Sequence, residues 1–280
     1  MPSLPRALSR EFAGPAQRFR LTTVDGVSLS GTRVGTADPA IVLCHGFSGW
    51  HRKPRPVQFA DALARWFTVY GFDFRGHGES EGISTFGSLE VNDIAAVLER
   101  ARQDGHARVA TVGGSMGGIA VIRHGALIGG TDAVVAISTP ARWDGHRSAA
   151  VRRMAWLTGS PVGRRLMRAA GVRLPETWDR PESPEDLVGK IAPVPLLIVH
   201  GRDDHFFDED DRHTRHDLRT LRQARKRHVR NEYETDTERA DKDSSHEVTP
   251  RRRVHAGPSF ETTAGARPMV KSCRWRRVTL

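Results

Sequence analysis

Residues 108–127, RVATVGGSMGGIAVIRHGAL, contain the most informative pattern of the chain. A partly β-branched run leads into Gly113-Gly114-Ser115-Met116-Gly117, and a second apolar run follows. This order predicts a strand, a tight turn and a helix, the setting in which a G-x-S-x-G turn exposes its serine hydroxyl. Glycines are needed beside the serine because side chains there would collide with neighbouring chain. The sequence therefore predicts Ser115 as a nucleophile at a helix N-terminus, where the helix dipole favours negative charge.

Short apolar runs alternate with segments of helical periodicity on both sides of this turn. Strands are predicted at 19–24, 27–33, 40–44, 67–74, 108–112, 133–137 and 195–200. Helices are predicted at 57–67, 89–102 and 119–127. This alternation indicates an α/β fold, with a mostly parallel sheet and helices on both faces. The alternation stops at about 140–190, where proline- and arginine-containing helical pieces predict a short cap inserted above the sheet.

Two other loops that follow predicted strands carry residues suited to the same chemistry. In His45-Gly46-Phe47-Ser48-Gly49, the glycines allow the Phe47 N–H to face a developing oxyanion, together with the Met116 N–H. The alternative is an ordinary strand-ending turn in which His45 bonds to the backbone. In His200-Gly201-Arg202-Asp203-Asp204, Asp204 is the better candidate to orient a general-base imidazole, while Asp203 is expected to cap the turn.

Together these segments resemble the α/β-hydrolase superfamily. The matching motifs, in the family's order and spacing, are HGFSG (45–49), DFRGHGES (73–80), GGSMGG (113–118) and HGRDD (200–204). The resemblance covers about residues 17–211 and is closest to monoglyceride-lipase-like and serine-aminopeptidase-like members.

The resemblance also implies roles for individual residues. Ser115 would be the nucleophile and Asp204 the acid of the catalytic triad, with Phe47 and Met116 as the backbone oxyanion donors. Residues 75–80 would form a scaffold loop in which His77 has a structural role.

The base histidine is the point at which this sequence departs from the family. Family members carry it beyond the acid, in a Gly-His loop after one more apolar strand. The corresponding window here, 229–238, has no histidine, no glycine and no apolar run. The candidate histidines considered outside that window are His213, His216, His228, His246 and His255. His228 lies in a basic helical stretch and His246 lies 42 residues past Asp204, so an ordinary solvent-facing histidine is the favoured interpretation of both.

Charge and composition change after residue 211. Residues 1–211 hold 25 Lys and Arg against 24 Asp and Glu, whereas 212–280 hold 18 against 9. Only ten residues of this tail are Leu, Ile, Val, Met or Phe, below the roughly 20% at which a chain can offset its ordering entropy. We therefore expect a hydrolase core with its cap over 1–211 and a basic tail over 212–280, disordered or read out of frame. The family's C-terminal strand and helix are expected to be missing or degenerate; a true basic interaction tail is the competing hypothesis.

The composition also limits cofactors, partners and location. Two cysteines, Cys44 and Cys273, cannot build a disulfide framework, and the acidic run 208–211 is better explained by the first turn of a helix than by a metal site. No apolar stretch reaches 18 residues and the N-terminus lacks the apolar segment of a secretory signal, so we expect a cytoplasmic protein without a membrane span. No nucleic-acid-binding module accompanies the tail's arginines, so a nucleic-acid or acidic-surface binder is the weaker alternative.

The predicted function is hydrolysis of a small carboxylic ester, thioester or amide through an acyl-enzyme on Ser115, without metal or organic cofactor. The apolar residues of the cap fit an acyl pocket and simple packing equally well; they are Trp143, Met154, Trp156, Leu157, Leu166 and Met167. A hydrolase fold that lacks turnover, because the base and last strand are missing, is the main alternative. The sequence leaves the oligomeric state open.

Overall fold

The computed structural model describes residues 7–143, 148–178, 180–201, 204 and the backbone of 273–278. Its strands are β1 (Ala16–Thr22), β2 (Ser28–Val34), β3 (Ala40–Cys44), β4 (Thr68–Phe72), β5 (Val109–Gly114), β6 (Ala133–Ile137), β7 (Leu196–Gly201) and β8 (Cys273–Val278). Its helices are α2 (Pro54–Leu63), α3 (Glu90–Gln103), α4 (Met116–Leu127), α5 (Ala149–Gly159), α6 (Pro161–Ala169), α7 (Pro184–Leu187) and the 3-10 helix η1 (Val188–Ile191).

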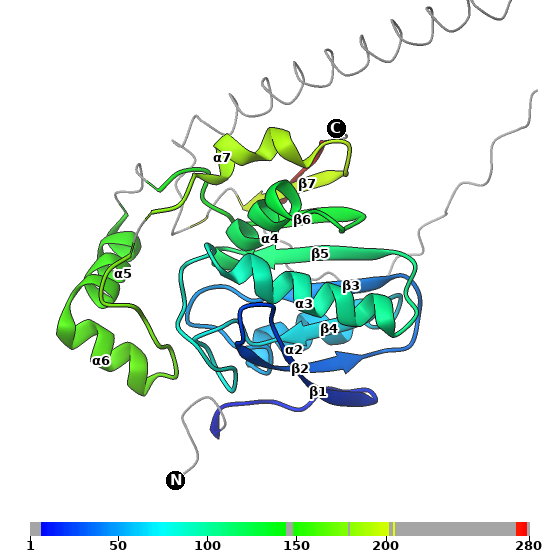
Figure 1. The fold of residues 1–280 in the computed structure, drawn as a ribbon, viewed down its shortest axis with the longest axis horizontal. Helices are drawn as coiled ribbons and strands as arrows, with labels where there is room; N and C mark the ends of the chain where they lie inside the picture. The colour runs from blue at the N-terminus through cyan, green and yellow to red at the C-terminus, as the bar shows by residue number, and fades with distance from the viewer. Residues whose placement is uncertain (1–6, 144–147, 179, 202–203, 205–272, 279–280) are drawn as a thin grey trace, which may run out of the picture.

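In the part of the chain that the structure describes, the strands form one eight-stranded sheet in the order β1-β2-β4-β3-β5-β6-β7-β8 (Figure 1). The five central strands, from β4 to β7 in this order, run parallel, and the strands at both edges pair antiparallel. Strand β3 pairs with β4 on one side and with β5 on the other, and four of its five residues are buried. This burial explains the continuous apolar run AIVLC, because a central parallel strand is covered on both faces.

The strand order places helices on both faces of the sheet. The connection from β3 to β4 moves toward one edge, whereas those from β4 to β5 and from β5 to β6 move toward the other. Parallel crossovers are right-handed, so α2 lies on one face and α3 and α4 lie on the opposite one (Figure 1). Helices α3 and α4 contact each other directly, as this arrangement requires. The predicted α/β architecture is confirmed.

Most predicted elements agree with the structure to within a few residues. The hairpin β1–β2 turns at Asp25-Gly26 as expected, where Gly26 has a φ of +83°. Helix α2 differs: it begins at Pro54 and ends at Leu63, not over 57–67. Proline is favoured in the first turn of a helix, because its missing N–H would have no partner there.

The C-terminal edge of the sheet was predicted only in part. Beyond β7, the family's apolar strand was expected to be missing or degenerate. The antiparallel strand β8 occupies that edge and pairs with all of β7. Strand β8 lies within the basic tail, which was expected to be disordered or read out of frame, and the rest of 212–280 lies outside the described residues. The segment CRWRRV was not predicted as a strand, because its arginines interrupt the alternation of apolar and polar residues that is typical of one.

The core is formed by buried apolar side chains between the sheet and the helices on its two faces. Five histidines are also buried. For three of them burial lowers the pKa, to about 3 for His45 and to about 4 for His77 and His124. His124, near the end of α4, is 1% exposed and its Nδ1 has no hydrogen-bond partner among the described residues.

Acid is therefore expected to destabilise the fold, and substitution of His124 measures the contribution of this histidine. An unfolded histidine takes up a proton near pH 6.5, whereas the folded His124 does not until about pH 4, so the free energy of unfolding falls as the pH drops through this window. Each such histidine contributes about 1.4 kcal/mol per pH unit. Replacement of His124 by leucine should reduce the pH dependence by about this amount, as measured by urea denaturation between pH 6.5 and pH 4.5. An unchanged slope would show that His124 is not neutral in the fold.

Candidate active site

Ser115 lies at the turn between β5 and α4 in a conformation that few residues adopt. Its φ is +52° and its ψ is −117°. Its N–H donates to the Ile137 carbonyl of β6 at 2.9 Å, and its carbonyl accepts from the Ile119 N–H at 3.1 Å, which begins the helix. Its side chain makes no capping hydrogen bond, so the hydroxyl is not used to hold the helix. The predicted strand–turn–helix setting of Ser115 is present.

The two glycines that flank Ser115 have no room for a side chain. A Cβ at Gly117 would lie 2.5 Å from the Cys44 carbonyl oxygen and 2.6 Å from that of His45, both at the end of β3. A Cβ at Gly113 would overlap the Gly117 carbonyl. Gly114, the variable position of the motif, would meet nothing closer than 3.9 Å. Glycine is therefore required at position 117 by packing against the end of β3, and at position 113 by the backbone of the turn itself.

The loop after β3 lies against the serine turn. A Cβ at Gly46 would be 3.4 Å from the Ser115 Cβ and 3.2 Å from the Gly114 carbonyl oxygen. Gly46 is therefore adjacent to the candidate nucleophile, and Phe47 is the next residue in the chain. Among the described residues, neither the Phe47 N–H nor the Met116 N–H donates to a protein acceptor.

His45 fixes the orientation of the peptide that contains the Phe47 N–H. Its Nε2 accepts from the Phe74 N–H at 3.0 Å, so its Nδ1 carries the proton and donates to the Gly46 carbonyl at 2.8 Å. The Gly49 N–H donates to the same carbonyl at 3.0 Å. In a trans peptide the carbonyl and the next N–H point in opposite directions, so the Phe47 N–H points away from the His45 ring. His45 thus bonds to the backbone, as the alternative interpretation of this loop expected. These bonds orient the peptide whose N–H is the candidate oxyanion donor.

A buried carboxylate joins this loop to the scaffold loop 75–80. Asp73 is 1% exposed and accepts from the backbone N–H and Nδ1 of His51, at 2.7 and 2.6 Å, and from the Glu79 N–H at 2.8 Å. Burial alone would raise the pKa of Asp73, but His51 and the other donors hold it below its usual value. The carboxylate therefore stays ionised and ties the loop after β3 to the loop after β4.

His77 lies inside the scaffold loop, as predicted. Its ring contacts those of His45 and Phe47, with centroids 5.1 and 5.8 Å apart, and its Nδ1 lies 3.1 Å from the Arg75 carbonyl. The next residue, Gly78, bonds to the segment that follows the cap helix α6, since the Gly78 N–H donates to the Gly171 carbonyl. These contacts are compatible with the structural role expected of His77.

Asp204 follows β7, which lies two strands from β5 in the sheet. Because these strands are parallel, Asp204 and Ser115 both follow the carboxyl ends of their strands. Its side chain is 11% exposed, and one oxygen lies 3.8 Å from Nε2 of His200, the residue before the last one of β7. The sequence had assigned no role to His200. The candidate bases His213, His216, His228, His246 and His255, and the acidic run 208–211, lie outside the described residues.

The apolar residues predicted in the cap differ in how far they are buried. Met167 is buried, whereas Trp156 and Leu166 are both 53% exposed on α5 and α6. Trp143 contacts Trp178, with ring centroids 5.0 Å apart, and Trp178 in turn contacts Phe86. The sequence did not single out Trp178, because one tryptophan in an irregular segment has no periodic signal.

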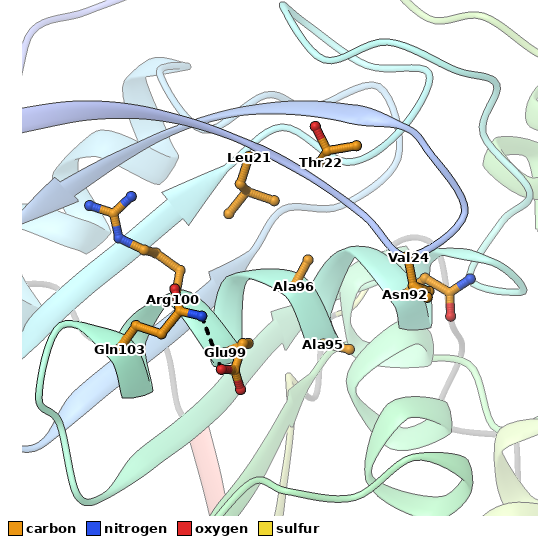
Figure 2. A pocket seen from close by; sticks show the side chains of 9 residues that line it. All are labelled: Leu21, Thr22, Val24, Asn92, Ala95, Ala96, Glu99, Arg100 and Gln103. Atoms are coloured by element: carbon orange, nitrogen blue, oxygen red, sulfur yellow. Dashed lines mark hydrogen bonds between the residues drawn. The ribbon is translucent and has the colours of Figure 1, made fainter.

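A pocket of about 420 Å³ lies elsewhere, between the β1–β2 hairpin and α3 (Figure 2). It is lined by Leu21, Thr22, Val24, Asn92, Ala95, Ala96, Glu99, Arg100 and Gln103. Of the polar side chains around it, Gln103 donates to Glu99 and Arg100 donates to Asp104. None of the predicted site residues lines it, so it carries no part of the candidate chemistry.

The glycine contact can be tested by a pair of substitutions. Gly117→Ala should lower the free energy of unfolding by about 1–3 kcal/mol, because the added methyl group meets two carbonyl oxygens that cannot move independently. Helix propensity alone would predict a gain of up to about 1 kcal/mol, so the sign of the change is decisive. Gly114→Ala is the matched control and should change stability little, as measured by urea denaturation. Equal stability of the two variants would contradict the close packing at Gly117.

Comparison with known proteins agrees with this geometry. The model of the alpha/beta hydrolase family matches residues 41–256. "Uncharacterized protein YfhR" of Escherichia coli O157:H7 is 29% identical over 204 residues, which are 68% of this chain and 63% of YfhR. The chain therefore spans less than two thirds of that relative. The Salmonella typhimurium YfhR is 26% identical over 70% of this chain and 67% of its own length.

Solved structures show the same fold. The esterase Pf2001 of Pyrococcus furiosus superposes with a TM-score of 0.55 at 22% identity, over 74% of this chain and 77% of that one. The esterase RhEst1 of Rhodococcus sp. gives a TM-score of 0.53 at 20% identity, over 68% and 82%. In the described part of the chain, no helix is long and apolar enough to cross a bilayer. From its fold, its serine turn and the match over residues 41–256, the chain belongs to the alpha/beta hydrolase family.

Proposed function

We propose that this protein is a serine hydrolase that cleaves a small carboxylic ester through an acyl-enzyme on Ser115. The observation that carries the proposal is the position of Ser115, held at a φ of +52° at the start of α4, next to Gly46. A strained backbone conformation is maintained only where the surrounding structure enforces it, and residues in such conformations cluster at active sites. That two structural neighbours are described as esterases supports the choice of an ester.

In the proposed reaction, the Ser115 Oγ attacks the ester carbonyl while its proton passes to a histidine. The carbonyl oxygen becomes an oxyanion, which accepts hydrogen bonds from the Phe47 and Met116 N–H groups. Loss of one such donor typically costs about 3–4 kcal/mol of transition-state stabilisation. The tetrahedral intermediate expels the alcohol, which takes the proton from the histidine. Water then attacks the acyl-enzyme by the same route and releases the acid.

Asp204 is proposed to orient and stabilise the histidine. Its place after β7, on the same sheet edge as the serine turn, supports this role. The histidine itself is proposed to come from the residues after Asp204, where His228 and His246 are weak candidates and the sequence selects neither. Its contact with His200 gives Asp204 one imidazole neighbour at 3.8 Å already. The competing proposal is a hydrolase fold that lacks a working base.

Labelling with a fluorophosphonate probe tests the proposal, because the probe reacts with serines that a base activates. The intact chain should be labelled, and Ser115→Ala should not be. Ser138→Ala is the matched control: Ser138 follows β6 with a φ of +47°, but no helix begins at that residue, so labelling should persist. Labelling that survives Ser115→Ala would contradict the proposed nucleophile. An unlabelled intact chain would favour the protein without a working base.

The role of Asp204 can be tested with the same probe. Asp204→Asn retains the shape of the side chain but loses its charge, so labelling should slow by about 10³- to 10⁴-fold if Asp204 supports the base. The rate of probe incorporation is the measurement, with Asp186→Asn, on the short helix α7, as a charge-matched control. An unchanged rate in Asp204→Asn would remove it from the mechanism.

A further inference from the structure

Four aromatic side chains form a continuous row that starts at the candidate oxyanion loop. Phe47 stacks on Phe86, with centroids 5.1 Å apart and planes inclined by 24°. Phe86 contacts Trp178 at 4.9 Å, and Trp178 contacts Trp143 at 5.0 Å. The row joins two loops of the body to two segments of the cap. None of the four side chains is fully buried, so each presents part of its surface to solvent.

The polar ends of the row are satisfied within the protein. The Trp178 indole N–H donates to the Thr85 carbonyl at 3.1 Å, and the Trp143 indole N–H donates to the Pro181 carbonyl at 2.6 Å. Both donors are therefore engaged, and what the tryptophans offer to a ligand is aromatic surface.

Phe86 holds its place in the row at a conformational cost. Its φ is +56°, which is unusual for a bulky residue and strained without support. The support comes from Glu90, which is fully buried. The Glu90 carboxylate accepts from the Ser84 hydroxyl at 2.9 Å, from the Thr85 N–H at 2.8 Å, from the Thr85 hydroxyl at 2.6 Å and from the Gly87 N–H at 2.8 Å. One carboxylate thus fixes the backbone on both sides of Phe86.

The same loop is fastened to the helix that begins at Ser115. A Cβ at Gly87 would lie 2.9 Å from a methyl carbon of Ile119, in the first turn of α4. The buried Arg123 of α4 donates to the Gly87 carbonyl at 3.0 Å and to the Glu182 carbonyl of the cap at 2.8 Å. The position of Phe86 is therefore set relative to the candidate nucleophile and to the cap together.

We propose that the row Phe47–Phe86–Trp178–Trp143 is the binding site for an aromatic ring carried by the ester substrate, with Glu90 as the residue that positions Phe86. This proposal rests on the proposed function for the reaction, but the binding it describes does not require a working base. Aromatic side chains attract further rings in stacked and edge-to-face arrangements, in addition to the gain from buried area. The row carries no charged side chain, so its specificity is for flat apolar groups.

A matched pair of ligands separates ring recognition from simple apolar binding. Methyl phenylacetate and methyl cyclohexylacetate have similar size, but only the first is aromatic. Their dissociation constants for the full chain carrying Ser115→Ala can be measured by ligand-observed NMR, without turnover. The phenyl ester should bind about 2- to 10-fold more tightly. Equal affinity for the two esters would overturn the proposal.

Variants in the same Ser115→Ala background identify the row as the source of the preference. Phe86→Leu should abolish the preference, and Glu90→Gln should abolish it with all four rings still present. Phe59→Leu, an exposed phenylalanine on α2, should leave it unchanged. If Phe86→Leu does not fold, as judged by its thermal transition, Trp178→Leu takes its place. A preference that survives these substitutions would overturn the proposal. If the Ser115→Ala chain prefers the phenyl ester but the fluorophosphonate probe does not label the intact chain, the result counts against the proposed catalysis only.

Discussion

The candidate active site depends on one close approach of backbone to backbone. The turn between β5 and α4 packs on the end of β3 so tightly that no Cβ fits at Gly117, and the turn itself leaves no room for one at Gly113. This contact sets the left-handed conformation of Ser115 and places the loop 45–49 beside it. Two strands that are neighbours in a parallel sheet end at the same edge, so the contact follows from the order of the strands. The order of the strands in the sheet and the geometry of the serine turn therefore depend on each other.

The loops around that turn are held by buried polar groups. Asp73 joins the loop after β3 to the loop after β4, Glu90 holds Phe86, and Arg123 links both a body loop and the cap to α4. Buried carboxylates are costly unless they are fully hydrogen-bonded, and both of these accept three or more donors. Groups satisfied in this way are rigid, and a site that stabilises a transition state needs donors placed before the substrate arrives.

The sequence was sufficient for the parts of the fold that arise from local pattern. The strand 40–44 and the turn 113–117 were identified because burial on both faces and a steric need for glycine leave unmistakable residue choices. Glu90 was not identifiable, since an acid in the first turn of a helix is an ordinary feature of sequence. The strain at Phe86 and the row it completes arise from contacts between distant segments, which no local period records. The base histidine remains a prediction for the same reason, because the sequence after Asp204 has no pattern that selects one.

The way in which α5 and α6 are attached has a consequence for changes in their length. The strongest contacts of these two helices are with each other, and α5 has no buried residue. Gly163 brings the pair together, since a Cβ there would lie 2.5 Å from the Leu157 carbonyl oxygen. The hairpin is therefore held together mainly from within. A change in its length would leave the close packing of the serine turn at Gly117 in place, because that packing involves only the ends of the central strands.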